Sequence, residues 1–408
     1  MTDDEQLLLA DIRANPKDDQ PRKVYADLLL ARADIRGEYM SIAVDMPWDD
    51  AKRKRFEKLK RKEKQFAAKL GLTGLNLSWF RGLPNSVSAT VEQVLQHGDA
   101  LSRLPIESLY LIDGVQDLAK LVELPLLSTV ETLSLGQATS SNVAPFRPVP
   151  IARDDMAALC ASPHLKALRH VSFKESLSDE SAALLGAAPW LAHVEDLTIY
   201  DWTHGGIRGE SLARVLAREL PSLRSVSLTG LSLGEPGGRA LGDAVLPALE
   251  SLTISRSKLG AGAGAAHVLS RVTSLRSLYI SEDDLRDAIV GLDLAPTRTL
   301  RALQLPKCHL GDAGAAALAS SQAFLELESL VLTGNELTLE GVVALANATG
   351  MPKLTELHVS DNRLLTGRQT YVESPEDSEG VSGYYDERIP PDEIRALFAH
   401  RPGLRVWS

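Results

Sequence analysis

The sequence repeats one hydrophobic pattern along most of its length, and this repetition limits what the chain can fold into. Residues 300–335 contain the pattern L-x-x-L-x-L twice, with an alanine-rich apolar run between the copies. The pattern starts at Ile106, Val130, Leu168, Val194, Leu223, Leu249, Leu275, Leu300, Leu327 and Leu354. A repeat of about 20 to 50 residues predicts a stacked array, because each unit can bury its apolar side only against its neighbours.

The spacing of the repeats is regular with one exception. Successive starts lie 24 to 29 residues apart, but 38 residues separate Val130 from Leu168. The long interval contains Pro145, Pro148 and Pro150, which lack a backbone donor and interrupt helices and central strands. The sequence therefore predicts an inserted loop in this interval.

Each repeat changes its hydrophobic period along its length. The first residues alternate between apolar and polar, as in RSVSL and ESLTI, which predicts a strand with one buried side. A stretch rich in alanine and leucine follows, and Ser178 or Asp312 stands where a helix N-cap would satisfy free amides. Each repeat is therefore expected to be a strand, a turn and a helix.

These repeats resemble a known family. The L-x-x-L-x-L strand, the KCHL and GNEL turns and the helix start LGDAGAAALA are similar to leucine-rich repeats of the ribonuclease-inhibitor type over residues 106–365. The resemblance implies an α/β solenoid, a horseshoe with a parallel β-sheet on the concave face and α-helices on the convex face. The ladder position after the strand carries asparagine only at Asn335 and Asn362, so we expect irregular turns elsewhere. The other ladder residues are Ser176, Trp202, Leu231, Ser257 and Cys308.

The segment before the repeats has a resemblance of its own. The stretch DDQPRKVYADLLLARADIRGEYMSIA is similar to the N-terminal repeat-companion domain that precedes leucine-rich repeats in bacterial paralogous families. The matching residues are Asp19, Pro21, Arg22, Tyr25, Ala26, Asp27, Leu29, Asp34, Arg36, Gly37 and Glu38. The resemblance implies a cap for the array. We expect a helical N-terminal cap over residues 1–85, repeats over 86–365, and an acidic loop with a C-terminal cap over 366–408.

A run of positive charge lies inside the expected cap. Residues 49–69 hold ten Lys or Arg and four Asp or Glu, a net charge of +6 in a chain whose net charge is −10. Phe56, Leu59, Phe66 and Leu70 form an apolar line at helical spacing, so residues 49–70 are predicted as one basic helix. Two interpretations stay open. The helix rests this line on the first repeats with its charges in solvent, or residues 52–69 bind nucleic acid, an acidic partner or an anionic surface.

The sequence shows no catalytic or cofactor motif. It has no P-loop, H-E-x-x-H, C-x-x-C or G-x-S-x-G. The glycine-rich stretch around Gly260, Gly262 and Gly264 is in phase with the repeats, so we assign it to a tight turn and helix packing and not to dinucleotide binding. The sequence predicts a chain that is not an enzyme and that takes no cofactor and no metal.

Composition indicates a cytoplasmic protein. Cys160 and Cys308 lie in different repeats and form no disulfide framework, and the acidic N-terminus differs from a basic signal peptide. No stretch approaches about 18 consecutive apolar residues, which argues against membrane insertion. The net charge of −10 disfavours general nucleic-acid binding. We expect the protein to be monomeric when alone.

The strand alternation defines an exposed face. The fourth and sixth positions of each repeat should face the core, whereas the third and fifth should face the hollow, where most are Ser or Thr. Small polar residues suit a curved, solvated sheet, but Tyr, Trp and Arg are typical anchors of protein interfaces. The candidate partner-binding residues are Tyr110, Lys174, Tyr200, Trp202, Arg256, Tyr279, Glu282, His358 and Asp361. We therefore expect a non-catalytic scaffold or adaptor that binds a protein partner on the concave face.

The repeat rhythm breaks after residue 365. Residues 366–390 are polar and acidic and are predicted as an extended loop. Residues 391–407 return to a helix and a last strand, which would cover the final apolar face of the array.

Overall fold

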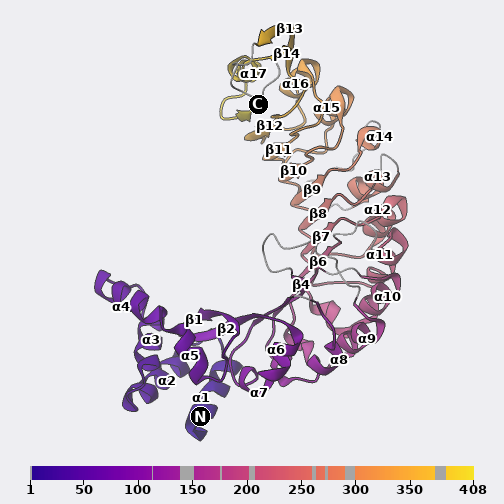
Figure 1. Cartoon of the computed structure of the whole chain (residues 1–408). Coiled ribbons are helices and arrows are strands. Elements are labelled where there is room, and N and C mark those ends of the chain that lie inside the picture. Colours follow the sequence, from indigo (N-terminus) through magenta and orange to yellow (C-terminus); the bar gives the residue numbers. More distant parts are fainter. Residues whose placement is uncertain are drawn as a thin grey trace. The chain divides into compact units, whose positions relative to one another are not determined.

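The computed structural model describes residues 2–112, 114–137, 151–174, 177–201, 207–259, 263–271, 274–289, 299–372 and 383–408. The chain divides into two compact units, Met1–Thr203 and His204–Ser408, and each is taken by itself. Both are built from strand, turn and helix repeats, so the predicted α/β solenoid is confirmed (Figure 1). The predicted loop between Val130 and Leu168 falls mostly on residues 138–150, outside the described residues.

The first unit begins with helices and continues with a sheet. The leading helices are α1 (Asp3–Ala14), α2 (Gln20–Ala31), α3 (Ile35–Val44), α4 (Asp50–Lys60) and α5 (Glu63–Lys69). The strands are, in sheet order, β1 (Asn76–Phe80), β2 (Leu83–Ala89), β3 (Ser108–Ile112), β4 (Thr132–Gln137), β5 (His170–Phe173) and β6 (Asp196–Tyr200). β1 is antiparallel to β2, and the following neighbours are parallel. The connecting helices are α6 (Val91–Gln96), α7 (Gly98–Leu101), α8 (Leu118–Leu121), α9 (Arg153–Ala161) and α10 (Asp179–Ala187), with 3-10 turns η1 (Pro125–Ser128), η2 (Leu165–Ala167) and η3 (Pro189–His193).

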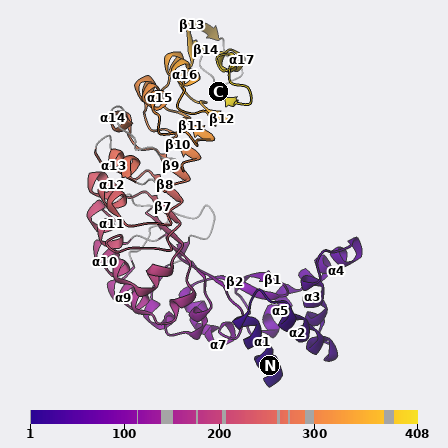
Figure 2. The same ribbon diagram turned by 180° about the vertical axis from the view of Figure 1, so that it is seen from behind.

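The second unit repeats the same pattern more regularly. Its parallel strands are, in sheet order, β7 (Ser225–Thr229), β8 (Ser251–Ser255), β9 (Ser277–Ser281), β10 (Ala302–Gln304), β11 (Ser329–Val331), β12 (Glu356–His358) and β15 (Arg405–Trp407). Its helices are α11 (Gly209–Val215), α12 (Gly234–Asp243), α13 (Ala263–Arg271), α14 (Arg286–Ile289), α15 (Gly311–Ser320), α16 (Leu339–Ala346) and α17 (Pro391–Ala396). Both ribbon views show α11–α16 along one side of these strands, which leaves the other sheet face without helices (Figures 1 and 2). We call that uncovered side the open face.

Burial along the strands follows the predicted alternation. In β3, Leu109 and Leu111 are buried while Ser108 and Tyr110 are half-buried. The same alternation recurs in β5 to β9. The leucines therefore form the core between sheet and helices, and the third and fifth positions lie on the open face. Ser134 of β4 departs from the rule because it is buried although it occupies a fifth position.

Glycine sets the distance between neighbouring helices in the second unit. A Cβ atom on Gly209 would lie 2.2 Å from the backbone oxygen of Leu233, and one on Gly238 would lie 2.2 Å from the backbone oxygen of Gly264. Any larger residue would push the α11, α12 and α13 segments apart. The assignment of the glycine-rich stretch to helix packing is confirmed at Gly264, whereas Gly260 and Gly262 lie outside the described residues.

A ladder of buried hydrogen bonds runs through the turns of the second unit. Asn335 accepts the N–H of Cys308 at 2.9 Å, and Asn362 accepts the N–H of Asn335 at 2.7 Å. Asp283, which the ladder analysis of the sequence missed, takes the same place and accepts the N–H of Leu259 at 2.7 Å. These side chains satisfy backbone groups that the turn would otherwise bury without a partner.

The predicted single helix over residues 49–70 is wrong. α4 ends at Lys60 and α5 begins at Glu63. Leu59 and Phe66 would lie about 10 Å apart along one continuous helix, whereas the turn lets both pack around Tyr39 of α3. Trp79 of β1 joins this cluster. The apolar line therefore rests on the cap and not on the first repeats.

Three further expectations differ from the structure. Residues 366–390, predicted as an extended loop, include the antiparallel hairpin β13 (Leu365–Val372) and β14 (Gly383–Arg388). The cap predicted as helical over residues 1–85 includes β1 and the start of β2. Tyr, Thr, Val, Trp and Phe favour strands in both places. Ser178 caps α10 as expected, but Asp312 lies inside α15 and accepts the N–H groups of Thr338 and Gly341 at 2.8 and 3.0 Å.

Candidate binding surface

One continuous row of side chains crosses the open face of the second unit. Strand register pairs these residues in the order Ser227, Thr253, Tyr279, Gln304, Val331, His358 and Trp407. We call this set the fifth-position row. Tyr279 and His358 are three strands apart, which corresponds to about 14 Å. Two of the predicted site residues are thus brought onto one surface.

The end of the fifth-position row is an aromatic and charged cluster. The rings of His358 and Trp407 stack with centroids 4.2 Å apart and an interplanar angle of 7°. The guanidinium of Arg405 lies 5.5 Å from the centroid of the Trp407 ring and pairs with Glu356. Trp407 nevertheless remains 37% exposed. The sequence assigned Trp407 only to a capping strand, although its alternation with Val406 already placed it on the open face.

Small side chains form the row beside Tyr279. This parallel row of third positions consists of Ser277, Ala302 and Ser329. Within its own row, Tyr279 lies between Thr253 and Gln304 and is the largest of the three. A large, stiff ring above a floor of small residues is the arrangement of an interface anchor, because little side-chain entropy is lost on binding.

The turns that follow the strands present a column of residues in the left-handed conformation. The column is Gly230 (φ 74°), Arg256 (48°), Glu282 (54°), Lys307 (56°), Gly334 (69°) and Asp361 (57°). Neighbouring turns are joined through the backbone, as in the 2.9 Å bond from Arg256 N–H to the Ser281 oxygen. The expectation of irregular turns is therefore wrong for these repeats. Three predicted site residues, Arg256, Glu282 and Asp361, lie in this column, which also contains the unpredicted Lys307.

Residues other than glycine are strained in this left-handed column, so Arg256, Glu282, Lys307 and Asp361 each carry a conformational cost. Replacing Glu282 with glycine is expected to stabilise the protein by about 0.5–1 kcal/mol, because glycine relieves the left-handed strain but adds entropy to the unfolded chain. Urea unfolding measures the change. Glu250, which is not among the left-handed residues, is the matched control, and Glu250→Gly should lower stability. Equal losses in both variants would show that position 282 carries no strain.

A second column of charged residues lies two positions further along each turn, and sequence reasoning missed it. His309 Nδ1 lies 2.6 Å from Glu336 Oε1, and Arg363 lies 3.1 Å from the other carboxylate oxygen. The hydrogen bond from His309 is the main reason why the pKa of Glu336 is lowered. Lys258, His309 and Glu336 all have positive φ. The rim of the open face is therefore lined by fixed charges of both signs.

The first unit carries Tyr110, Lys174 and Tyr200 on its own open face. Tyr110 lies in register with Ser134, which pairs in turn with Ser172 of β5. Lys174 and Tyr200 directly follow the paired residues Phe173 and Ile199, so register places them side by side. Tyr110 also lines a hollow of about 230 Å³ whose other walls are Asn76, Ser78, Ser86 and Ser88. Trp202 lies outside the described residues.

Two polar features near Lys174 and Tyr200 were not among the predicted site residues. His170 and Asp196, paired across β5 and β6, are joined by a side-chain hydrogen bond on the open face of the first unit. The hydroxyls of Ser134 and Ser172 are shielded and make no hydrogen bond within the described part of the chain. This open face therefore presents the His170–Asp196 pair, whereas the two hydroxyl groups lie beneath it and are not accessible.

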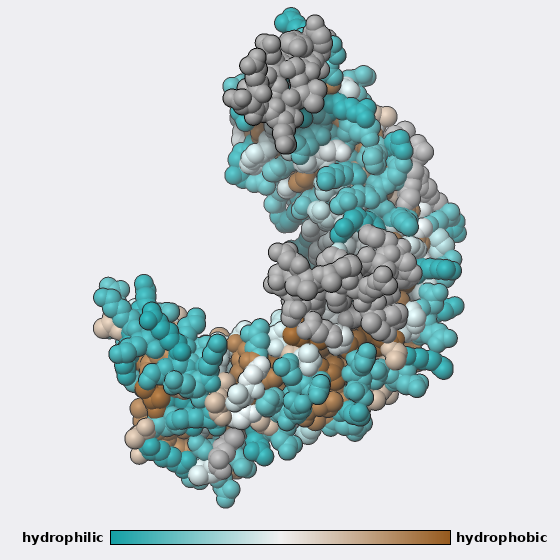
Figure 3. All heavy atoms as spheres, in the orientation of Figure 1, coloured by the Kyte–Doolittle hydropathy of each residue, from teal (hydrophilic) through white to brown (hydrophobic). Residues whose placement is uncertain are grey.

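The positive charge predicted for residues 52–69 lies on the outer side of α4 and α5. Lys52 pairs with Asp45 and Arg55 pairs with Glu38. The remaining exposed cations are Arg53, Lys54, Lys58, Lys60, Arg61, Lys64 and Lys69, and Lys69 pairs with Asp34. Figure 3 shows the projecting α4 as mostly hydrophilic. Because Leu59 and Phe66 are buried in the cap, this surface offers charge and little apolar area.

The described residues show little that suits catalysis. Both cysteines are free and buried, and burial raises the pKa of Cys160 and of Cys308 to about 12, far from a reactive thiolate. No His, Cys, Asp or Glu side chains in the described ranges gather in a group of three that could hold a metal ion. Among the described helices, none has the length and apolarity needed to cross a membrane.

A family model described as Leucine Rich repeat matches residues 298–319 and 327–346. A search of curated proteins gave no match. An internalin (InlF) from Listeria monocytogenes is similar at 15% identity, over 79% of this chain and 86% of the internalin chain, with a TM-score of 0.36.

A second solved structure belongs to a TLR13–ssRNA13 complex. It is similar at 15% identity over 67% of this chain and 38% of the other chain, with a TM-score of 0.37. Leucine-rich repeat proteins commonly mediate protein–protein interaction and are typically non-enzymatic binding scaffolds. The matched repeats and the recurring strand, turn and helix of both units support a leucine-rich repeat protein.

Proposed function

We propose that this chain is a non-catalytic scaffold that binds a protein partner on its open sheet face. The fifth-position row carries the proposal, because it presents Tyr279 and the stacked His358–Trp407 pair on one preformed surface. Aromatic anchors about 14 Å apart fit an interface with two separate anchor points. The charged turn columns would form its polar rim.

The proposal also covers the type of repeat, the nature of the N-terminal cap, the cellular compartment and the oligomeric state. We assign the repeats to the ribonuclease-inhibitor type, because each repeat from α11 to α16 returns through a helix. We assign α1–α3 to a repeat-companion cap, supported by Gly37, where a Cβ atom would lie 2.6 Å from the backbone oxygen of Ala26 and so requires glycine between α2 and α3. The free, buried cysteines favour a reducing cytoplasm. We take the protein to be monomeric until it meets its partner.

A second candidate function uses the basic surface of α4 and α5. The core already holds the apolar side of these helices, and the exposed cations other than Lys69, which pairs with Asp34, point to solvent and can meet a polyanion. Nucleic acid or an anionic surface would then bind through charge alone, and its affinity should fall steeply as salt rises. A protein held by Tyr279 and Trp407 would depend on salt much less.

Removing both anchors tests the leading proposal. We expect Tyr279→Ala with Trp407→Ala to weaken partner binding by at least about 30-fold, because even one interface hot spot is worth about 2 kcal/mol or more and the two effects need not add in full. The measurement is capture of cytosolic proteins by the immobilised full chain, followed by binding assays with the partner so identified. Leu339→Ala, which removes an apolar side chain that is 42% exposed on α16, is the control and should bind normally.

Other arms of the same experiment separate the alternatives. If the double variant captures the partner as well as the wild type does, the binding site is not on the fifth-position row. Loss of capture in Tyr110→Ala with Tyr200→Ala, but not in the double variant, would move the site to the first unit. Nucleic acid retained by every variant and released by moderate salt would favour the basic surface.

A further inference from the structure

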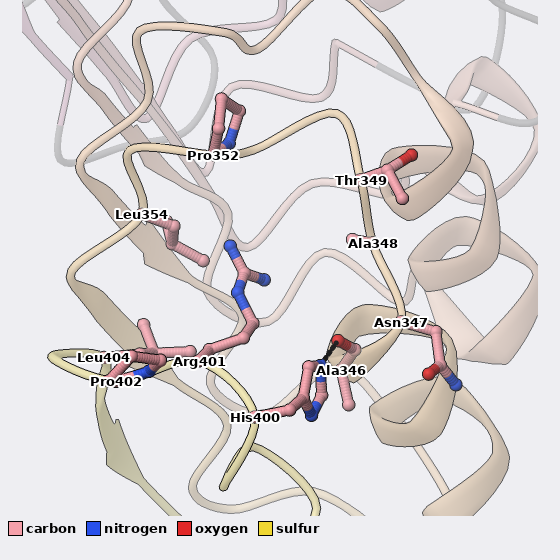
Figure 4. Close-up of a pocket in the computed structure, with 10 residues that line it drawn as sticks. All are labelled: Ala346, Asn347, Ala348, Thr349, Pro352, Leu354, His400, Arg401, Pro402 and Leu404. Carbon is pink, nitrogen blue, oxygen red and sulfur yellow. Dashed lines mark hydrogen bonds between the residues drawn. The ribbon is translucent and has the colours of Figure 1, made fainter.

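A pocket of about 490 Å³ lies near the end of the second unit, away from the fifth-position row. Its walls come from the end of α16, from the loop that leads to β12, and from the segment after α17 (Figure 4). The lining residues are Ala346, Asn347, Ala348, Thr349, Pro352, Leu354, His400, Arg401, Pro402 and Leu404. This volume is within the range of sites that take small molecules, about 300–1,000 Å³.

Arg401 brings an uncompensated positive charge to this pocket. One guanidinium nitrogen, Nη2, donates to the backbone oxygen of Met351 at 2.5 Å. The other, Nη1, is shielded from solvent and has no hydrogen-bond partner, and no carboxylate of the described residues forms an ion pair with Arg401. Burial lowers the pKa of Arg401, as expected for a cation without a counter-charge. Figure 4 shows the guanidinium reaching between Leu354 and Ala348.

The other polar groups of the pocket bring no negative charge. His400 Nε2 donates to the backbone oxygen of Ala346 at 3.0 Å, so Nδ1 of the neutral ring is an acceptor and offers an anion no hydrogen bond. Asn347 already donates to the backbone oxygen of Val343 at 3.0 Å. No aspartate or glutamate is among the lining residues. The charge of the pocket is therefore positive, and a bound carboxylate would supply the counter-charge that Arg401 lacks.

Most of the lining side chains are apolar, and these select among anions. Six of the ten lining residues are Ala, Pro or Leu. A fully solvated inorganic ion gains nothing from such walls, whereas a hydrocarbon body does. A carboxylate oxygen is the strongest acceptor for Nη1–H, the one terminal guanidinium donor that has no partner in this structure. We infer that the pocket between α16 and the segment after α17 binds a carboxylate that carries an apolar body.

Such a carboxylate has two sources, a free small acid or the end of a polypeptide. Hexanoate represents the first source, and the tripeptide Gly-Gly-Leu with a free C-terminus represents the second. Hexanamide and the tripeptide amide are the neutral counterparts. We expect one of the two acids to bind the full chain saturably in saturation-transfer NMR. Its neutral amide should bind at least about tenfold more weakly than the acid. The acid that binds more tightly names the source.

Variants connect the binding to this pocket. Arg401→Gln should weaken binding of the acid about tenfold, whereas Arg301→Gln, which alters an exposed arginine paired with Glu328, should not. Because Arg401 also holds the Met351 backbone, Ala348→Leu is a second test that keeps the guanidinium and fills the space. It should abolish binding with a circular dichroism melt close to that of the wild type.

Three results would overturn the inference. They are the absence of saturable binding of either acid by the wild type, undiminished binding in both folded pocket variants, and binding of inorganic phosphate in preference to both acids. The last result would show that the guanidinium takes a bare oxyanion and that the apolar wall has no role.

Discussion

Replacing Asn335 with alanine is expected to lower the free energy of unfolding by about 3 kcal/mol, since each buried backbone group left without a partner costs about 1–3 kcal/mol. The Asn335 amide oxygen accepts the N–H groups of Cys308 and Leu310 at 2.9 and 3.4 Å, and its nitrogen donates to the Leu305 oxygen at 2.6 Å. The residue is fully buried, so solvent cannot replace these bonds without entering the core. Urea unfolding monitored by circular dichroism measures the loss.

Two further variants show whether the hydrogen bonds are the cause. Asn347→Ala removes an exposed asparagine that donates to the Val343 oxygen at 3.0 Å, and it should cost about 0.5 kcal/mol or less. Asn335→Cys should fall between the two, because Cys308 occupies the same ladder place and its thiol donates to the Ile280 oxygen at 3.2 Å. If the cysteine variant loses as much unfolding free energy as the alanine variant, the stabilisation comes from the two N–H groups that the Asn335 oxygen accepts and not from the bond that its nitrogen donates. An alanine variant with wild-type stability would contradict the ladder.

Replacing Asp283 with asparagine is expected to stabilise the protein by about 2–3 kcal/mol at pH 7 and by nearly nothing at pH 4. Burial raises the pKa of Asp283 to about 6, although the N–H groups of Leu259 and Ser257 partly offset this. The folded state therefore binds the proton more tightly than the unfolded state, whose aspartate has a pKa of about 3.9. The stabilising contribution of the protonated form is complete below pH 4 and is lost as the pH rises through 6.

The measurement is the difference in unfolding free energy between variant and wild type at several pH values from 4 to 7.5. Asparagine keeps the acceptor oxygen for Leu259 and stays neutral throughout, so the difference should grow with pH and then level off. Asp284→Asn is the matched control. The hydrogen bond from Arg286 is the main reason why the pKa of Asp284 is lowered, so this variant should be slightly less stable at pH 7. A pH-independent difference at Asp283 would show that its carboxyl is not perturbed.

Local periodicity explains why so much of the fold could be predicted. Each strand alternates between core and open face, and a leucine at the fourth position is buried whichever neighbour it meets. The placement of Tyr279 and His358 on the open face followed from this rule. Trp407 obeys the same rule, but its strand is short and the sequence predicts only a cap there. Asp283 escapes a search of the ladder positions for asparagine, because it is an aspartate.

Other features depend on contacts between residues far apart in the sequence. The break between α4 and α5 is set by the cluster around Tyr39, which no helical period describes. The hairpin of β13 and β14 forms across residues that look like a polar loop. The pocket beside Arg401 exists only because the segment after α17 lies against the end of α16. Contacts between distant segments, and not the local hydrophobic pattern, decide these three features.

The sequence alone determined the repeat, the strand, turn and helix in each unit, and the face on which each strand residue lies. A repeating pattern is enough for this, because every repeat solves the same local burial problem against a similar neighbour. Only the tertiary structure decided that His358 stacks on Trp407, that Asp283 is buried with a raised pKa, and that Arg401 lacks a counter-charge. These properties come from which side chains share a dry or crowded space, and that depends on packing between distant segments.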